Sequence, residues 1–298
     1  MTVVQDDLRP LLFSIAYRML GSVAEAEDVV QEAYLRRAST DDDVENEKAY
    51  MTTVTTRLAI DVLRSARVRR ESYVGEWLPE PLVEPEAPAV VEAEESVSLA
   101  MLVLLERLNP VERAVFVLRE SFDVPFDQVA AVVDRSEDNC RQILSRARKR
   151  VTDEEPRFDA DPVERRTLAA RFLAAAREGD LEGLVAVLAP DAVLIGDGGG
   201  IARSIPHPMR GAAAVARAIA TFYGQVDALG VTLEAVWVNG HPGFRTTDAE
   251  GRVVNVVGLD VVDGHITSIY SMLNPEKLGH LGETSELGLR PSQVGRRH

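Results

Sequence analysis

Near the middle of the chain, one short segment combines arginines with small polar side chains in a pattern suited to reading DNA. Base edges in the major groove are contacted by Arg, Asn and Gln side chains, and phosphates by Arg and Lys. Ile143, Leu144 and Ala147 recur at helical spacing, so the segment would bury one face and expose the other. The residues expected on the exposed face are Ser136, Asn139, Arg141, Gln142, Ser145, Arg146, Arg148 and Lys149. A basic amphipathic helix that only contacts solvent is the alternative.

The residues before this segment would supply the element that positions it. A helix over 125–133 would pack its valines on a second helix over 136–151. Asp134 and Arg135 form the turn between them, and Ser136 caps the second helix. The sequence therefore predicts a helix-turn-helix, in which the second helix enters a DNA groove.

A second set of arginines lies near the end of a long predicted helix over 48–70. Arg57, Arg64 and Arg67 are spaced seven and three residues apart, which places them near one face. Such a face suits phosphates, whereas a structural alternative is that basic side chains near a helix C-terminus complement its dipole.

Bulk composition bounds the class of protein. The 298 residues carry a net charge of −15, but no Lys or Arg lies between Arg70 and Arg107, so the average hides the basic segments. The length favours about two to three domains. A single cysteine, Cys140, allows no internal disulfide and is interpreted as a small filler rather than a redox sensor. No apolar run is long enough for a membrane span, no secretory signal is recognisable, and no metal-ligand spacing or cofactor motif occurs, so we expect a cytoplasmic protein.

The acidic segment 72–96 contains four prolines and is predicted to be a linker. It carries one apolar island, which solvated linkers seldom do, so we expect this island to dock on another surface. The island consists of Trp77, Leu78, Pro79, Glu80, Pro81 and Leu82.

The second half of the chain changes from helical to strand periodicity. Helices are followed by apolar runs separated by Asn239-Gly240 and Asp263-Gly264, dipeptides that tight hairpins prefer. This order predicts an α+β cone over 160–280, with a flexible tail over 281–298. The polar residues available for chemistry in such a cone are Asp197, His207, His241, Asp260 and Tyr270. Asp260 lies in an alternating strand and is expected to point inward.

Several segments resemble those of extracytoplasmic-function sigma factors. The stretch 28–36, Asp-Val-Val-Gln-Glu-Ala-Tyr-Leu-Arg, resembles their polymerase-binding helix, 57–71 their promoter-melting helix, and 109–150 their last DNA-binding region. The apolar island resembles the linker motif of the subgroup with a fused SnoaL-like (NTF2-like) domain. Two more segments resemble further signatures of that subgroup. The first is Asp197, Gly198, Gly199 and Gly200, and the second is Asn274, Pro275, Glu276, Lys277 and Leu278.

The resemblance implies partners and roles. Core RNA polymerase would be bound by Asp28, Gln31, Glu32 and Leu35. The minus-ten promoter element would lie near Arg57, Asp61, Arg64, Arg67 and Arg70, and the minus-thirty-five element would be read by Arg141, Gln142, Ser145 and Arg146. The sequence departs from the family at Asp134, where Gly is common; Asp tolerates left-handed φ, so we expect the turn to survive.

These observations predict two all-α sigma domains, the second with a helix-turn-helix, followed by an α+β NTF2-like/SnoaL-like cone. The expected domains are region 2 over 1–71, the linker over 72–96, region 4 over 97–153, the cone over 160–280 and the tail. The predicted function is promoter-specific transcription initiation, regulated by contact of the fused domain with the island. The linker glutamates are further expected to thread a positively charged polymerase channel.

Two other functions remain open from the sequence. The cone could be a small-molecule enzyme that uses an Asp/His pair, with the helical half as an interaction module, although no pair is set by spacing. The chain could also be a repressor or activator that binds DNA alone, although it shows no dimer seam. We expect no enzymatic activity, and the cone's pocket either takes a regulatory small-molecule ligand or serves only for docking.

Overall fold

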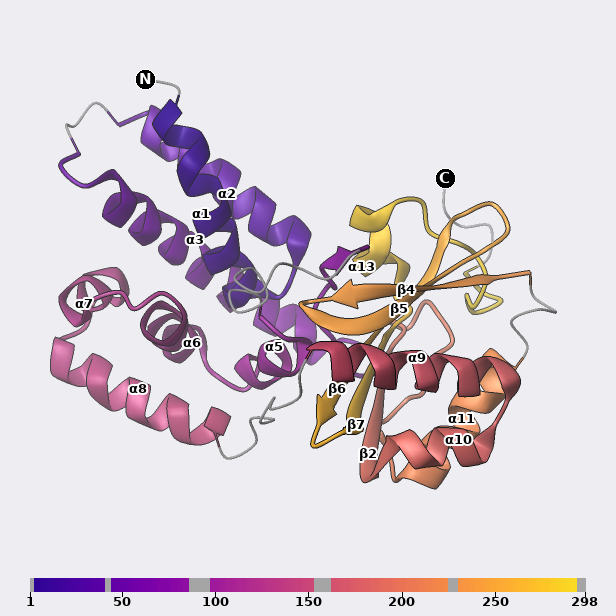
Figure 1. Cartoon of the computed structure of the whole chain (residues 1–298). Coiled ribbons are helices and arrows are strands. Elements are labelled where there is room, and N and C mark those ends of the chain that lie inside the picture. The colour runs from indigo at the N-terminus through magenta and orange to yellow at the C-terminus, as the bar shows by residue number, and fades with distance from the viewer. Residues whose placement is uncertain (1–2, 41–43, 86–96, 153–161, 225–229, 294–298) are drawn as a thin grey trace. The chain divides into compact units, whose positions relative to one another are not determined.

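The computed structural model describes residues 3–40, 44–85, 97–152, 162–224 and 230–293, with only the backbone for residues 3–6, 67–71 and 162. The chain forms two compact units, each built from two stretches of sequence (Figure 1). The first unit contains Met1–Ser72 and Met101–Glu155, and the second contains Tyr73–Ala100 and Pro156–His298. The described part of the predicted linker, residues 73–85, therefore belongs to the second unit.

The first unit begins with a three-helix bundle. Its helices are α1 (Val3–Leu20), α2 (Val23–Ala38) and α3 (Glu47–Glu71). Ser22 caps α2 by accepting a hydrogen bond from the Glu25 amide. The buried side chains that join the helices include Leu12, Ile15, Met19, Val30 and Leu63.

The remaining helices of this unit carry the helix-turn-helix. They are α5 (Leu99–Leu105), α6 (Pro110–Phe116), a π-helix (Val117–Ser121), α7 (Phe126–Val133) and α8 (Glu137–Thr152). Asn109 caps α6 in a reciprocal capping box with Glu112. The helical stretch 110–121 is not one regular α-helix, because its second half widens into the π-helix. Asp134 adopts a φ of 54° and a ψ of 57°, so the left-handed turn survives without glycine, as predicted.

The second unit is a seven-stranded sheet with helices on one face (Figure 1). The strand order is β1-β4-β5-β6-β7-β2-β3, and all neighbouring pairs are antiparallel except the parallel pair β2 and β7. The strands are β1 (Val83–Glu84), β2 (Leu188–Asp197), β3 (Met209–Arg210), β4 (Thr232–Val238), β5 (His241–Thr247), β6 (Val253–Val262) and β7 (His265–Met272). The helices are α9 (Pro162–Glu178), α10 (Leu181–Val187), α11 (Ala212–Tyr223), α13 (Pro275–Leu278) and a 3₁₀ turn (Gly279–Leu281).

Both predicted hairpin turns are confirmed. Asn239 and Gly240 have φ values of 52° and 73°, and Asp263 and Gly264 have 48° and 70°. These positive angles match the twist of the strands that the turns join. The sequence missed the short strands β1 and β3, which are too brief to show periodicity.

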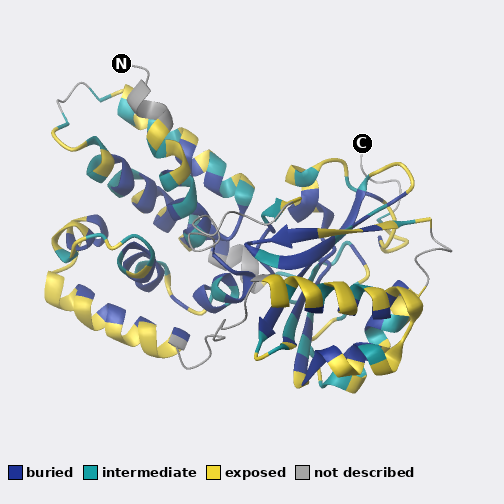
Figure 2. Ribbon diagram, in the orientation of Figure 1, coloured by how far each residue is buried: buried dark blue, intermediate teal, exposed yellow. Residues whose placement is uncertain are grey.

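The main core of the second unit lies between the sheet and its helices. Phe172 of α9 stacks on Phe244 of β5, and Tyr223 of α11 meets the same ring edge to face. Figure 2 shows the buried stretches of the strands and of the helices in dark blue. Leu259 and Val261 belong to this core, so Asp260 between them points to the opposite face of the sheet. Asp260 is only 2% exposed, so its carboxyl is buried on the side of β6 away from this core.

The segment 281–293, predicted to be a flexible tail, is held on the sheet by backbone hydrogen bonds. Ser285 donates to the Val253 carbonyl, and Arg290 donates to the Ile201 carbonyl. Leu289 is 6% exposed. The glycines and serines that suggested mobility serve here as turns. Within the described residues, none of the helices has the length and apolar character needed to cross a lipid bilayer.

Candidate functional site

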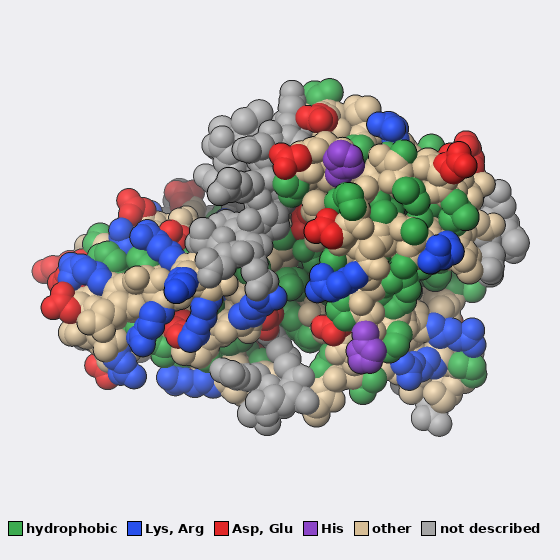
Figure 3. Space-filling model, turned by 90° about the horizontal axis from the view of Figure 1, so that it is seen from below, with side chains coloured by type: hydrophobic (Ala, Val, Ile, Leu, Met, Phe, Trp, Pro, Cys, Tyr) green, Lys and Arg blue, Asp and Glu red, His purple; other side chains and the backbone are tan. Residues whose placement is uncertain are grey.

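Helix α8 presents the polar face that the sequence predicted. Ile143, Leu144 and Ala147 are buried, and every residue expected to face outward is exposed. Figure 3 shows Lys and Arg side chains gathered on this part of the first unit. Cys140 is buried on the inner side, where burial raises the pKa of its thiol. A basic, exposed helix after a tight left-handed turn has the geometry of a DNA-reading helix.

The structure adds acidic partners that the sequence reasoning overlooked. Arg141 forms ion pairs with Glu137 and Asp138 and lies over the Phe126 ring, at 4.8 Å from its centre. These contacts hold the guanidinium at the start of α8, although exposed ion pairs contribute only about 0–1 kcal/mol each. The signal was readable, because acids three and four residues before an arginine face it on a helix.

Arg57 occupies an unexpected place within the first unit. Its guanidinium donates to the carbonyl oxygens of Ala131, at 2.8 Å, and Val132, at 3.1 Å, in the last turn of α7. Those carbonyls lack partners inside the helix, so Arg57 caps α7 and joins α3 to the helix-turn-helix. Arg64 is exposed and pairs with Asp61. The side chains of Arg67 and Arg70 lie outside the described residues.

The predicted polymerase-binding face of α2 is open. Asp28 and Gln31 are exposed, and Glu32 is half-buried and pairs with Arg36. Leu35 is 58% exposed, which is unusual for a large apolar side chain on a helix that also has a packed face. An exposed leucine beside acidic groups suits a protein partner.

A buried carboxylate joins the apolar island to the sheet of the second unit. Asp197, at the end of β2, is 0% exposed. Its Oδ1 accepts hydrogen bonds from the Tyr73 hydroxyl, at 2.6 Å, and the Gly199 amide, at 3.0 Å. Its Oδ2 accepts from the Leu78 amide, at 2.8 Å, and the Lys277 ammonium, at 2.7 Å. One local donor and three donors from two distant segments therefore satisfy one buried charge.

Lys277 completes this arrangement, which we call the linker clamp: Tyr73, Trp77, Leu78, Asp197, Asn274 and Lys277. The ammonium is 4.0 Å from the Trp77 ring centre and 4.9 Å from that of Tyr73, and it also donates to the Leu78 carbonyl. Burial and the Asp197 charge raise the pKa of Tyr73, so its hydroxyl remains a donor. A buried ammonium with two aromatic faces and a carboxylate is strongly held.

Neighbouring contacts extend the docking along the island. Asn274 caps α13 and donates to the Tyr73 hydroxyl at 2.8 Å. A Cβ on Gly199, where φ is 59°, would lie 2.3 Å from the Asn274 amide nitrogen, so glycine is required there. Asn239 exchanges hydrogen bonds with Leu82, beside the pairing of β1 with β4. Leu78, Pro79, Glu80 and Pro81 are buried as a result.

The structure thus brings together the three segments that the resemblance singled out. Within them, Pro275, Lys277 and Leu278 are buried, Glu276 is exposed, and Gly198 and Gly200 flank the loop that approaches the linker. Sequence reasoning missed Tyr73, which precedes the island, and Asn239, which was considered only as a turn residue. It also missed His280, whose ring contacts the Pro81 carbonyl oxygen at 2.8 Å.

Of the residues proposed for acid–base chemistry, His241, Asp260 and Tyr270 lie together on β5, β6 and β7, whereas Asp197 and His207 do not join them. Asp197 belongs to the clamp, and His207 is exposed in a loop. His241 and Asp260 face each other across β5 and β6, but Nδ1 and Oδ1 are 3.9 Å apart, beyond hydrogen-bond distance. Burial raises the pKa of Asp260 to about 7, and burial together with Arg165 lowers that of His241 to about 4. Burial likewise raises the pKa of Tyr270.

The Asp260 shift has a definite consequence for stability. Folding raises its pKa above the value of 3.8 for a free side chain, so the folded state holds the proton more tightly. The stability that this group contributes is therefore complete below about pH 4 and is lost as the pH rises through about 7. His241 has the opposite sense, since its lowered pKa favours folding above pH 6.5 and that contribution is lost as the pH falls towards 4. Among the described residues, no group of three or more His, Cys, Asp or Glu is arranged to hold a metal ion.

Three known protein families match successive parts of this chain. The pattern of Sigma-70 region 2 matches residues 5–69, that of Sigma-70 region 4 matches 98–151, and that of the SnoaL-like domain matches 169–269. Fold and matches together define a sigma factor with a fused SnoaL-like domain, so the predicted fold class is confirmed.

Individual relatives narrow the class. The chain is 39% identical to the ECF RNA polymerase sigma factor SigJ of Mycobacterium tuberculosis, over 98% of this chain and 97% of that one. It is 33% identical to the probable ECF RNA polymerase sigma factor SigI of the same species, over 94% of each chain. The crystal structure of M. tuberculosis SigJ is similar, with a TM-score of 0.74 and 36% identity, covering 93% of this chain and 98% of that one. The chain belongs to the ECF RNA polymerase sigma factor family.

Proposed function

We propose that this sigma factor directs promoter-specific transcription initiation in the cytoplasm and that its SnoaL-like domain regulates it by holding the linker. The regulatory part of the proposal rests on the linker clamp. There Asp197 accepts a hydrogen bond from the Leu78 amide, Lys277 donates one to the Leu78 carbonyl, and the two side chains form an ion pair. Core RNA polymerase would supply catalysis, while this chain would supply the promoter address and strand opening. The domain would act through contact, without chemistry of its own.

The partners would bind the exposed faces of the helices in the first unit. Asp28, Gln31, Glu32 and Leu35 on α2 would bind the polymerase, and the exposed polar face of α8 would read the minus-thirty-five element. The arginines of α3 would lie on the minus-ten element. Phosphate contacts by these arginines would position the protein, and α8 side chains would read base edges.

The contact between α3 and α7 implies a closed form of the first unit. Two elements centred near minus ten and minus thirty-five lie roughly 85 Å apart on straight duplex DNA, at about 3.4 Å per base pair. Arg57, however, joins α3 to α7 by hydrogen bonds of about 3 Å. The two modules must therefore separate before both elements can be bound, and a linker held at Trp77–Leu82 has less freedom to allow that. Of the linker glutamates expected to thread the polymerase channel, those at 86, 92, 94 and 95 lie outside the described residues.

Runoff transcription with purified core polymerase tests this proposal. A sigma factor yields transcripts only with core enzyme, a repressor blocks them, and an enzyme has no effect. The variant Asp197→Asn should change transcript yield from a cognate promoter, while Asp191→Asn, an exposed change on the same strand, should not. Equal yields from wild type and both variants would remove the regulatory part and leave the initiation part intact.

The second unit, which holds the linker, is also proposed to bind a small molecule beside it.

A further inference from the structure

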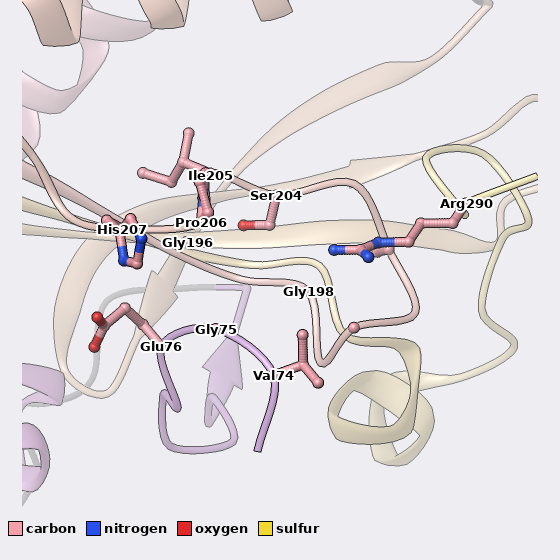
Figure 4. Close-up of a pocket in the computed structure, with 12 residues that line it drawn as sticks. Val74, Gly75, Glu76, Gly196, Gly198, Ser204, Ile205, Pro206, His207 and Arg290 are labelled. Atoms are coloured by element: carbon pink, nitrogen blue, oxygen red, sulfur yellow. The ribbon is translucent and has the colours of Figure 1, made fainter. Parts of the chain in front are cut away.

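A cavity of about 310 Å³ lies where the linker meets the glycine loop of the second unit (Figure 4). One wall is the linker segment 74–76, and the floor is formed by Gly196, Gly198 and Gly200, which have no side chains to occupy the space. Ile205 adds an apolar wall, and Val74 packs near Gly200, where an added Cβ would lie 3.0 Å away. The volume is at the small end of the range for ligand pockets.

Four polar side chains line this cavity, and within the described ranges none of them has a hydrogen-bond or ion-pair partner. Arg290 extends from the docked tail towards Ser204, and His207 and Glu76 lie at the other end (Figure 4). The Ser204 hydroxyl oxygen is sealed from solvent without a partner. A buried polar atom left unsatisfied costs free energy, so such a hydroxyl indicates a missing partner.

The chemistry of these groups defines the class of ligand. A guanidinium offers a planar fork of donors that matches a carboxylate, and a hydroxyl adds a further donor. The apolar surfaces of Val74 and Ile205 suit a hydrophobic body attached to that carboxylate. We infer that the cavity binds a small organic carboxylate, held at its anionic end by Arg290 and Ser204.

Such a ligand would regulate the linker, an extension that rests on the proposed function of the clamp. Because the cavity is lined by both the linker and the domain, a ligand binds fully only while the linker is docked. A ligand that binds only the docked state shifts the equilibrium by mass action. At a concentration of 100 times its dissociation constant, it raises the ratio of docked to released linker about 100-fold.

Methyl NMR of the full chain with benzoate as the probe tests this inference. Benzoate at millimolar concentration should shift the methyl signals of Val74 and Ile205, while benzyl alcohol, its uncharged counterpart, should not. Arg290→Gln should weaken benzoate binding by about tenfold or more. Arg203→Gln is the matched control, because Arg203 is exposed, lies close in sequence to Ser204 and does not line the cavity.

Three outcomes would overturn the inference: no shift of these methyl groups with benzoate, equal shifts with benzyl alcohol, or unchanged benzoate affinity in Arg290→Gln. These readouts do not depend on transcription. If the methyl groups respond as expected while Asp197→Asn leaves transcript yield unchanged, the ligand site stands and the regulatory role of the clamp fails. The reverse pattern would remove the ligand and keep the clamp.

Discussion

Replacing Lys277 by Met should release the linker from the sheet of the second unit. Methionine nearly preserves side-chain length but removes the charge that neutralises Asp197 and lies on the Trp77 ring. Both partners of the ion pair are buried, with side chains 8% and 0% exposed. Breaking a buried pair from one side costs about 3–5 kcal/mol, because the remaining charge is left uncompensated. Three other donors still reach Asp197, which places the expected loss towards the lower end of that range.

Hydrogen exchange at single amides measures this loss directly. The Leu78 amide donates to Asp197 and the Leu82 amide donates to Asn239, so both report on the docked linker. A loss of about 3 kcal/mol corresponds to exchange at Leu78 that is faster by roughly 100-fold, as long as the amide exchanges through linker release. Amides of β6 should exchange at unchanged rates. Leu78 exchange within threefold of wild type would refute the reasoning that the ion pair holds the linker.

The control variant is Asp191→Asn, an exposed carboxylate on β2 that should leave Leu78 exchange unaltered. Tyr73→Phe removes one donor to Asp197 and should accelerate exchange by less than Lys277→Met, since a hydrogen bond to a charged group contributes about 1.5–3 kcal/mol. An effect of Tyr73→Phe larger than that of Lys277→Met would place the anchor on the hydroxyl rather than on the ion pair.

Three further outcomes are expected. Asp260→Asn removes a carboxyl with a pKa of about 7. Between about pH 4 and pH 7 the wild type should lose stability that the variant keeps, so in urea unfolding the variant should gain up to about 4 kcal/mol relative to wild type. A stability difference that stays constant with pH would contradict the pKa shift. Arg57→Gln should lengthen the distance between dyes on α2 and α8 measured by energy transfer, while Arg64→Gln, exposed on the same helix, should not; equal distances would dismiss the cap on α7 as a closing contact. Truncation after residue 282 removes the buried Leu289 and should lower the free energy of unfolding by about 2–4 kcal/mol, whereas truncation after 293 should have little effect.

Local rules predicted much of this fold correctly. The left-handed Asp134 turn and both hairpin dipeptides depend only on backbone dihedral preferences within a few residues. The outward face of α8 follows from helical periodicity alone. The face on which Asp260 lies could not be predicted, because a strand with apolar residues on both sides carries no signal of which side meets the helices.

The candidate sites also differ in how far the sequence could predict them. The residues of α2 and α8 could be located from sequence because each set lies on one helix. The docked tail was missed, because its hold comes from backbone hydrogen bonds to β6 and the loop after β2, which leave no mark in composition. Tyr73 and Asn239 were missed because their partners lie in other segments.

By itself, the sequence determined the helices, the turns, the segregation of charge and the presence of three motifs. Only the tertiary structure decided that those motifs meet, since Asp197 lies 124 residues from Tyr73 and 80 from Lys277 along the chain. The physical reason is that a buried charge must be neutralised wherever the fold places it, and its partners are chosen by proximity in space. Periodicity and dihedral preference act over a few residues and contain no information about that proximity.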